Sequence, residues 1–217
     1  MIKFFNYFLV TFLFFFTPAY STNIKVFEFT KDELTNLKVR KVRGADEKTK
    51  YSVGDNENGN FLRAEANNSA SGLGKKITIN LVETPFLNIT WKVEKDLPGI
   101  NESSKKGHDY AARVFVVKKT GATPLSNRAM NYVFSSNKNV NTYHPSPFTK
   151  KSIDYVLSTT KDNFNEWVTV KVNVREHFKK FHNLNLEEIN GIAIMSDTDN
   201  SKLNSIAYYQ NIYFSTN

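Results

Sequence analysis

Residues 107–117 constrain the fold of this chain more than any other segment. They have the pattern of a buried β-strand, in which a regular pleat directs Tyr110 and Val114 to one side. The same pleat directs Asp109 and Arg113 to the other side. Two opposite charges on one face of a central strand need a partner, either an internal ion pair or a ligand. The segment therefore predicts a β-sheet protein with a polar patch on one sheet face.

Other strand patterns recur along the chain, separated by turn residues. Residues 86–93 alternate, with the inward positions held by Leu87, Ile89, Trp91 and Val93. Residues 67–74 look like a loop of small residues, and residues 175–182 like a short helix. With about ten short strands and no strand–helix alternation, the pattern predicts an all-β protein, an antiparallel jelly-roll β-sandwich with one short helix.

The first 21 residues are predicted to be a secretory signal peptide. Lys3 supplies a positive start, residues 4–16 form an apolar run, and Ala19 and Ser21 frame a cleavage site of small residues. An uncleaved anchor is the alternative, although the apolar run is short for a membrane span. Residues 22–217 then form a single β-sandwich domain in the periplasm or outside the cell.

Composition narrows the class of partner. The chain has no cysteine, so it contains no disulfide or zinc–thiolate site, and an exported protein of this kind suggests a bacterial envelope. The formal net charge of +8 reflects either a solvated, lysine-rich surface or affinity for acidic glycans or lipid headgroups. The positive charge is scattered and no nucleic-acid-binding motif occurs, so we expect no nucleic acid partner.

Asp197 and Asp199 lie one residue apart after a buried strand pattern. Oxygen-rich clusters of this kind hold hard cations, so one interpretation is a structural calcium ion bound by both carboxylates. The other is a turn in which the carboxylates accept hydrogen bonds from backbone N–H groups. An EF-hand is excluded, because Lys202 and Tyr208 stand where its loop needs glycine and glutamate.

Aromatic residues add to the polar patch. We expect Tyr132, Trp167 and Tyr209 to lie near Asp109 and Arg113 on a concave sheet face. Aromatic rings stack on sugar rings, while arginine and aspartate hydrogen-bond to hydroxyl groups. The alternative is a structural Arg–Asp pair together with aromatic side chains that belong to the core.

Catalysis has less support from the residues. Glycoside hydrolysis needs two carboxyl groups roughly 5 to 10 Å apart, and nothing in the sequence pairs the available acids. The Gly-x-Ser-x-Gly motif of serine hydrolases is missing, and no histidines have metal-binding spacing. No catalytic residue is assigned.

Four segments together resemble a bacterial family of exported proteins known as domain of unknown function 3047. They are residues 61–66, 89–93, 109–117 and 191–200, the last leading into 208–214. His108 and Phe134 depart from the family pattern, which has aspartate and tryptophan there. The resemblance implies a galactose-binding-like β-sandwich related in shape to carbohydrate-binding modules, and it implies no activity.

Together these observations predict an exported, non-catalytic binding module for a glycan or similar polyhydroxyl ligand on the concave sheet. The alternatives are a carbohydrate-active lyase or hydrolase using Asp109 or Asp197, and an envelope structural or assembly factor with a protein partner. Loops are the usual carriers of ligand contacts on a rigid sandwich. We therefore expect residues 94–108 and 136–151, the two long loops, to contribute to the site.

Overall fold

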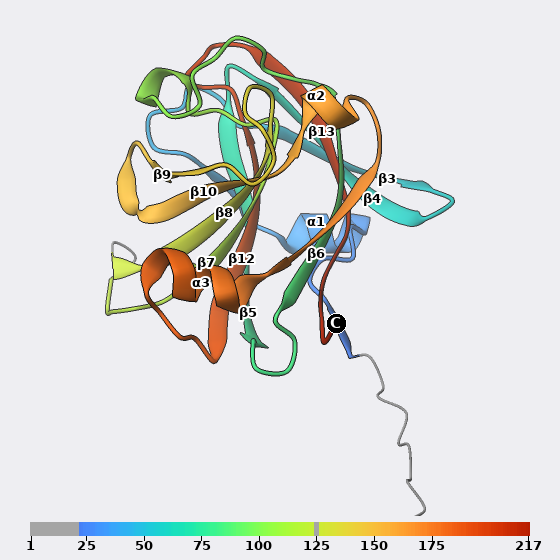
Figure 1. Cartoon of the computed structure of the whole chain (residues 1–217). Helices are drawn as coiled ribbons and strands as arrows, with labels where there is room; N and C mark the ends of the chain where they lie inside the picture. The colour runs from blue at the N-terminus through green and yellow to red at the C-terminus, as the bar shows by residue number, and fades with distance from the viewer. Residues whose placement is uncertain (1–21, 124–125) are drawn as a thin grey trace, which may run out of the picture.

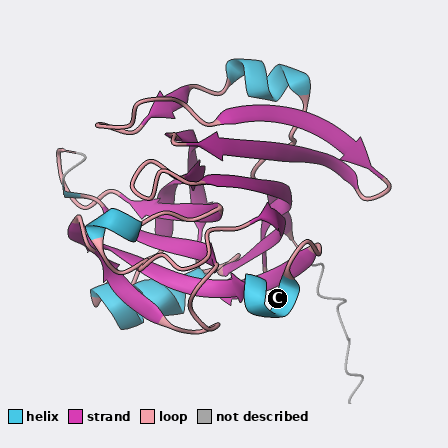
Figure 2. Ribbon diagram, turned by 90° about the horizontal axis from the view of Figure 1, so that it is seen from above, coloured by secondary structure: helices cyan, strands magenta, loops and turns pink. Residues whose placement is uncertain are grey.

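The computed structural model describes residues 22–123 and 126–217, so the predicted signal peptide lies outside the described residues. Within this part of the chain, the strands form one six-stranded and one seven-stranded sheet (Figure 1). Figure 2 shows the strands in stacked layers, with helices at the periphery. The prediction of an all-β jelly-roll sandwich is confirmed.

The six-stranded sheet has the order β11-β6-β13-β4-β3, and β1 pairs with β13. Its strands are β1 (Asn23–Lys25), β3 (Lys50–Asn56), β4 (Gly59–Asn67), β6 (Phe86–Lys95), β11 (Val168–Asn173) and β13 (Asn204–Ser215). The seven-stranded sheet has the order β2-β5-β12-β7-β8-β10-β9. Its strands are β2 (Val39–Lys41), β5 (Ala70–Asn80), β7 (Ala112–Lys118), β8 (Arg128–Ser135), β9 (Tyr143–Ser146), β10 (Thr149–Thr159) and β12 (Glu188–Asp197). Neighbouring strands are antiparallel except β8 and β10, which pair in parallel.

The core lies between the two sheets and follows the period-two pattern of the strands. In β6 the predicted inward side chains, from Leu87 to Val93, are all fully buried. The indole N–H of Trp91 donates to Oγ of Ser158 at 2.9 Å and so joins β6 to β10 of the opposite sheet. Burying a large apolar side chain contributes roughly 1.5–3 kcal/mol, so these positions supply much of the stability.

The strand predicted over residues 107–117 is shorter than expected. β7 begins only at Ala112, and from there Ala112, Val114 and Val116 alternate into the core as predicted. Before that point the pleat does not apply, so Tyr110 belongs to a separate small cluster outside the main core. Residues 96–111 instead form the connection from β6 to β7, with a single 3₁₀ turn, η1 (Lys105–Gly107).

The predicted helix near residue 175 is confirmed as α3 (Val174–His182). The side chain of Asn173 accepts a hydrogen bond from the N–H of Glu176 and caps its start, and Asn183 ends it in the left-handed conformation. The predicted loop 136–151 contains a strand that was not predicted, β9, whose four residues pair only with β10.

Two further short helices, α1 (Lys31–Asn36) and α2 (Thr160–Asn163), were not predicted. The start of α1 is specified locally. Thr30 Oγ1 accepts from the N–H of Glu33, and the Glu33 carboxylate accepts from the N–H of Phe29 at 2.8 Å. No helix among the described residues has the length and apolar character needed to cross a bilayer.

Candidate functional site

The polar residues gather on the outer face of the seven-stranded sheet, the face turned away from the six-stranded sheet. Residues 96–111 lie over part of this face, and Tyr110 packs there against Val133 of β8 and Val156 of β10. We call the area over β7, β8 and β10 the covered half. The area over β2, β5 and β12 is the open half.

A buried ion pair lies in the covered half. Arg113 extends from β7 to Asp197 at the end of β12, and the two side chains are 3% and 2% exposed. The guanidinium carbon lies 5.2 Å from the ring centre of Tyr110 and 5.5 Å from that of Phe115. Asp197 also accepts the N–H of Tyr110 at 3.2 Å. Of the two interpretations of the charged face, the internal ion pair is the arrangement that the structure contains, and it ties the covering loop to two strands.

Three carboxylates come together beside this pair. Oxygen atoms of Asp109, Asp197 and Asp199 lie within 4.8 Å of one another. Asp109 accepts hydrogen bonds from Nδ2 of Asn200 at 2.8 Å and from the N–H of Ser201 at 2.6 Å. Burial, and then the charge of Asp109, raise the pKa of Asp199. The carboxylates of Asp197 and Asp109 thus accept hydrogen bonds from backbone N–H groups, as in the turn-capping interpretation, and a calcium ion stays the untested alternative.

A second buried cluster centres on Asp154 of β10. Its carboxylate lies 2.7 Å from Nε2 of His108 and accepts a hydrogen bond from Nδ2 of Asn131. His144 lies 3.6 Å away, and its other ring nitrogen is 3.2 Å from the hydroxyl of Tyr110. Burial lowers the pKa of His108, and the hydrogen bond to Asp154 opposes that shift. The cluster joins the covering loop to β8, β9 and β10, and no sequence pattern predicts it because its residues are far apart in the chain.

The open half contains a groove of about 910 Å³. Its floor is formed by residues with small or no side chains in β5 and β12, namely Gly72, Gly74, Gly191 and Ala193. Gly74 lies opposite Ala193 in the register of these strands, so the backbone itself forms the bottom of the groove. Residues 67–74 were predicted to be a loop, and residues 70–74 instead belong to β5. The alternation of Gly72 and Gly74 with the apolar Leu73 was the sequence signal that could have predicted a strand here.

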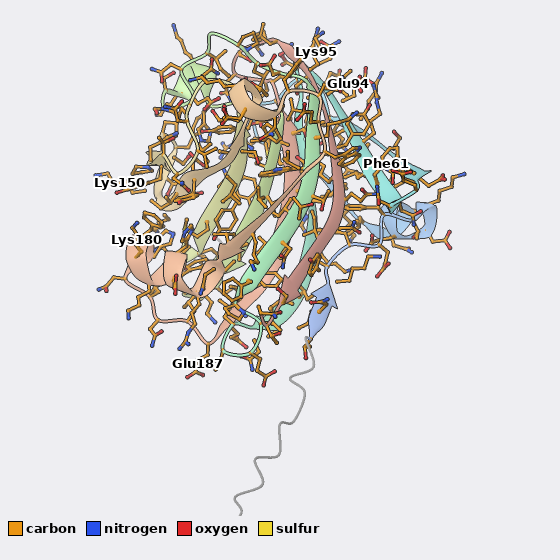
Figure 3. The ribbon with its side chains drawn as sticks, turned by 45° about the vertical axis from the view of Figure 1, so that its right-hand side comes forward. Phe61, Glu94, Lys95, Lys150, Lys180 and Glu187 are labelled. Carbon is orange, nitrogen blue, oxygen red and sulfur yellow. The ribbon has the colours of Figure 1, made fainter. Side chains whose placement is uncertain are left out.

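Trp167 lies elsewhere. It precedes β11 and packs on the outer face of the six-stranded sheet, 6.1 Å from the ring of Phe61 and 5.9 Å from that of Tyr208. Nζ of Lys92 lies 4.5 Å from the centre of the Tyr208 ring. Figure 3 labels Phe61 on this side of the molecule. The expectation that Trp167 accompanies Arg113 is therefore wrong, because the two residues belong to different sheets.

Tyr132 and Tyr209 were predicted to contact ligand, and their burial contradicts this. Both are buried in the core, because they occupy inward positions of β8 and β13. The Tyr209 hydroxyl donates to the carbonyl of Met195 at 2.7 Å and accepts the N–H of Arg113 at 3.0 Å. Tyr209 thus crosses the sandwich and supports the start of β7 from below. Asp109, within the covering segment 96–111, and Arg113, beneath it, are also buried, so neither lines an open face.

Comparison with known proteins assigns the family. Residues 35–213 match the family described as "Protein of unknown function (DUF3047)", and the chain belongs to this family. This confirms the resemblance seen in the four segments. No curated protein matches the sequence.

Solved structures show the shared fold. A family 30 carbohydrate-binding module of the cellulosomal cellulase Cel9D-Cel44B of Clostridium thermocellum aligns with a TM-score of 0.50 and 9% identity, covering 89% of this chain and 96% of that one. The xyloglucanase domain of NopAA from Sinorhizobium fredii aligns with a TM-score of 0.45 and 10% identity, covering 82% and 92%. A family 12 xyloglucanase from Bacillus licheniformis gives 0.45 and 8%, covering 91% and 99%. At these identities the similarity shows the fold alone.

Proposed function

We propose that the protein is an exported, non-catalytic module that binds a glycan or similar polyhydroxyl ligand in the groove of the open half. The observation that carries the proposal is the groove itself, a volume of about 910 Å³ over a backbone floor. Because Gly74 and Gly191 have no side chains, an extended ligand can approach the strand backbone closely there. The fold shared with a carbohydrate-binding module supports a glycan as that ligand.

The walls of the groove provide groups that hydrogen-bond to hydroxyls. Thr78, Asn127 and Asn190 all line it. Oδ1 of Asn127 is buried and has no hydrogen-bond partner among the described residues. Because that oxygen is closed to solvent, the groups available to a sugar hydroxyl are the other polar atoms of the walls. The lining thus combines small residues on the floor with polar and charged side chains on the walls, which suits a hydroxyl-rich ligand.

An enzyme is the less supported alternative. The acids considered for hydrolysis, Asp109 and Asp197, are buried and take hydrogen bonds or an ion pair from neighbouring residues. Neither lines the groove. A general acid or nucleophile must reach the scissile bond, so these two carboxylates do not serve a ligand bound there.

The test is to fill the groove without disturbing the sheet. An added Cβ at Gly74 meets only Cβ of Ala193, at 4.0 Å, which is ordinary contact. Gly74→Trp is therefore expected to fold normally and to weaken polysaccharide binding by at least about tenfold, since the indole occupies the ligand's volume. Ser52→Trp, at an exposed strand position of the other sheet, is the matched control.

Binding is measured by affinity electrophoresis and titration calorimetry on a panel of neutral and acidic polysaccharides, with melting temperature as the check on folding. Unchanged affinity in a folded Gly74→Trp protein would place the ligand elsewhere. Absence of binding across the panel would instead favour the envelope factor with a protein partner.

A further inference from the structure

We infer that the ligand of this groove is a polyanionic glycan, one that carries carboxylate or sulfate groups along its length. The inference rests on the proposed function and narrows its ligand class. The groove is lined by several cations, and none of its lining residues within the described ranges is acidic. A recessed surface with charges of one sign selects ligands of the other sign.

Most of the cations of the groove have no carboxylate partner. Arg40, Lys76 and Lys119 are exposed and form no ion pair within the described part of the chain. Lys75, which also lines the groove, pairs with Glu33 at 2.9 Å. The charges of Arg40, Lys76 and Lys119 are therefore available to an anionic ligand in the groove.

The arrangement of these cations fits an extended ligand better than a single ion. Arg40 lies on β2 at one side of the groove, Lys76 on β5, and Lys119 just beyond β7 at the other side. β2 and β7 are three strand spacings apart in the sheet, about 14 Å at about 4.8 Å per spacing. Charges separated in this way can each contact a different anionic group of one ligand polymer. A single exposed ion pair adds little affinity, and several such pairs together add more.

Two other polyanions fit the groove less well. A membrane surface is bound through apolar side chains as well as cations, and none of the large exposed hydrophobic residues among those described lines the groove. Single-stranded nucleic acid is held by stacking on aromatic rings, and the described lining contains no aromatic residue. A polyanionic glycan can instead be held by cations and by polar groups that hydrogen-bond to its hydroxyls, and the groove has both.

The test compares polymers that differ only in charge. Affinity for polygalacturonate is measured against its carboxyl-reduced form, and affinity for dextran sulfate against dextran, at low and at physiological salt. The double variant Lys76→Gln/Lys119→Gln is compared with Lys150→Gln/Lys180→Gln, which removes two exposed lysines outside the groove (Figure 3). Gly74→Trp reports whether binding occurs in the groove.

We expect at least one anionic polymer to bind about tenfold more tightly than its neutral counterpart, and to lose roughly three- to tenfold in affinity in Lys76→Gln/Lys119→Gln. Salt is expected to weaken this binding, and the control variant to leave it unchanged. Equal affinity for charged and neutral polymers, both lost in Gly74→Trp, would overturn the inference and leave the proposed function standing. Tighter binding of anionic vesicles or of an oligonucleotide would overturn the inference as well. If Gly74→Trp weakens the binding of no polymer, both the proposed function and this inference are refuted.

Discussion

Replacing Arg113 with methionine is expected to destabilise the protein severely. Methionine keeps much of the side-chain length that packs against Tyr110 and Phe115, but it removes the charge that faces Asp197. The carboxylate of Asp197 is only 2% exposed, and it would stay buried next to Asp109 without its partner. Breaking a buried pair in this way costs about 3–5 kcal/mol, so for a chain of this size the melting temperature should fall by about 6–20 °C.

A surface pair provides the matched control. Arg63 and Glu65 form an ion pair of 2.6 Å, but their side chains are 32% and 42% exposed. Water and salt screen such a pair, so Arg63→Met should cost no more than about 1 kcal/mol. Both variants are compared with the parent protein by urea unfolding, followed through the fluorescence of the two tryptophans.

The double variant Arg113→Met/Asp197→Asn separates charge from packing. Because it leaves no unpaired charge, it should recover much of the stability that Arg113→Met alone loses. A loss below about 1 kcal/mol in Arg113→Met, equal to that of Arg63→Met, would refute the argument that this pair is structural. Loss of glycan binding at unchanged stability would instead restore Arg113 as a ligand contact.

Three further predictions concern pH, calcium and export. Burial, and then the charge of Lys180, lower the pKa of His177 to about 4, so its contribution to stability is complete above pH 6.5 and is lost as the pH falls towards 4. In acid unfolding experiments His177→Phe should therefore lose less stability than the parent over this range, and parallel curves would contradict the assignment. Adding calcium or EDTA should leave the melting temperature unchanged, because hydrogen bonds already occupy the Asp109 carboxylate; a calcium-induced rise that Asp199→Asn abolishes would establish the metal site instead. N-terminal sequencing of exported protein should find residues 1–21 removed, and an intact N-terminus in the membrane fraction would indicate an anchor.

Much of the fold could be predicted because it depends on local patterns. The alternation in residues 86–93 indicated which side of β6 faces the core, and the pattern of residues 175–182 indicated α3. Short elements escaped prediction. α1 depends on a single turn capped by Thr30 and Glu33, and β9 on four residues that pair with β10, so neither has a long periodic signal.

The site was predictable only in part. Asp109, Asp197 and Asp199 were singled out from the sequence, and the fold brings them together with Arg113. Whether such residues contact a ligand or stay buried depends on which segment covers them. The periodicity of the strands carries no information about that. That residues 96–111 bury this polar patch is visible only in the tertiary structure, where they lie over β7, β8 and β10.

By itself, the sequence determined the family, the β-sandwich class and the inward side of the long strands, because apolar periodicity forces one face of each strand out of water. Only the tertiary structure decided which face of the sandwich is open. Glycines of β5 become a groove floor only when β12 places Gly191 and Ala193 beside them, and the wall cations come from β2, β5 and the end of β7. Such a surface is assembled from residues distant in the chain, and strand pairing, rather than local pattern, fixes their distances.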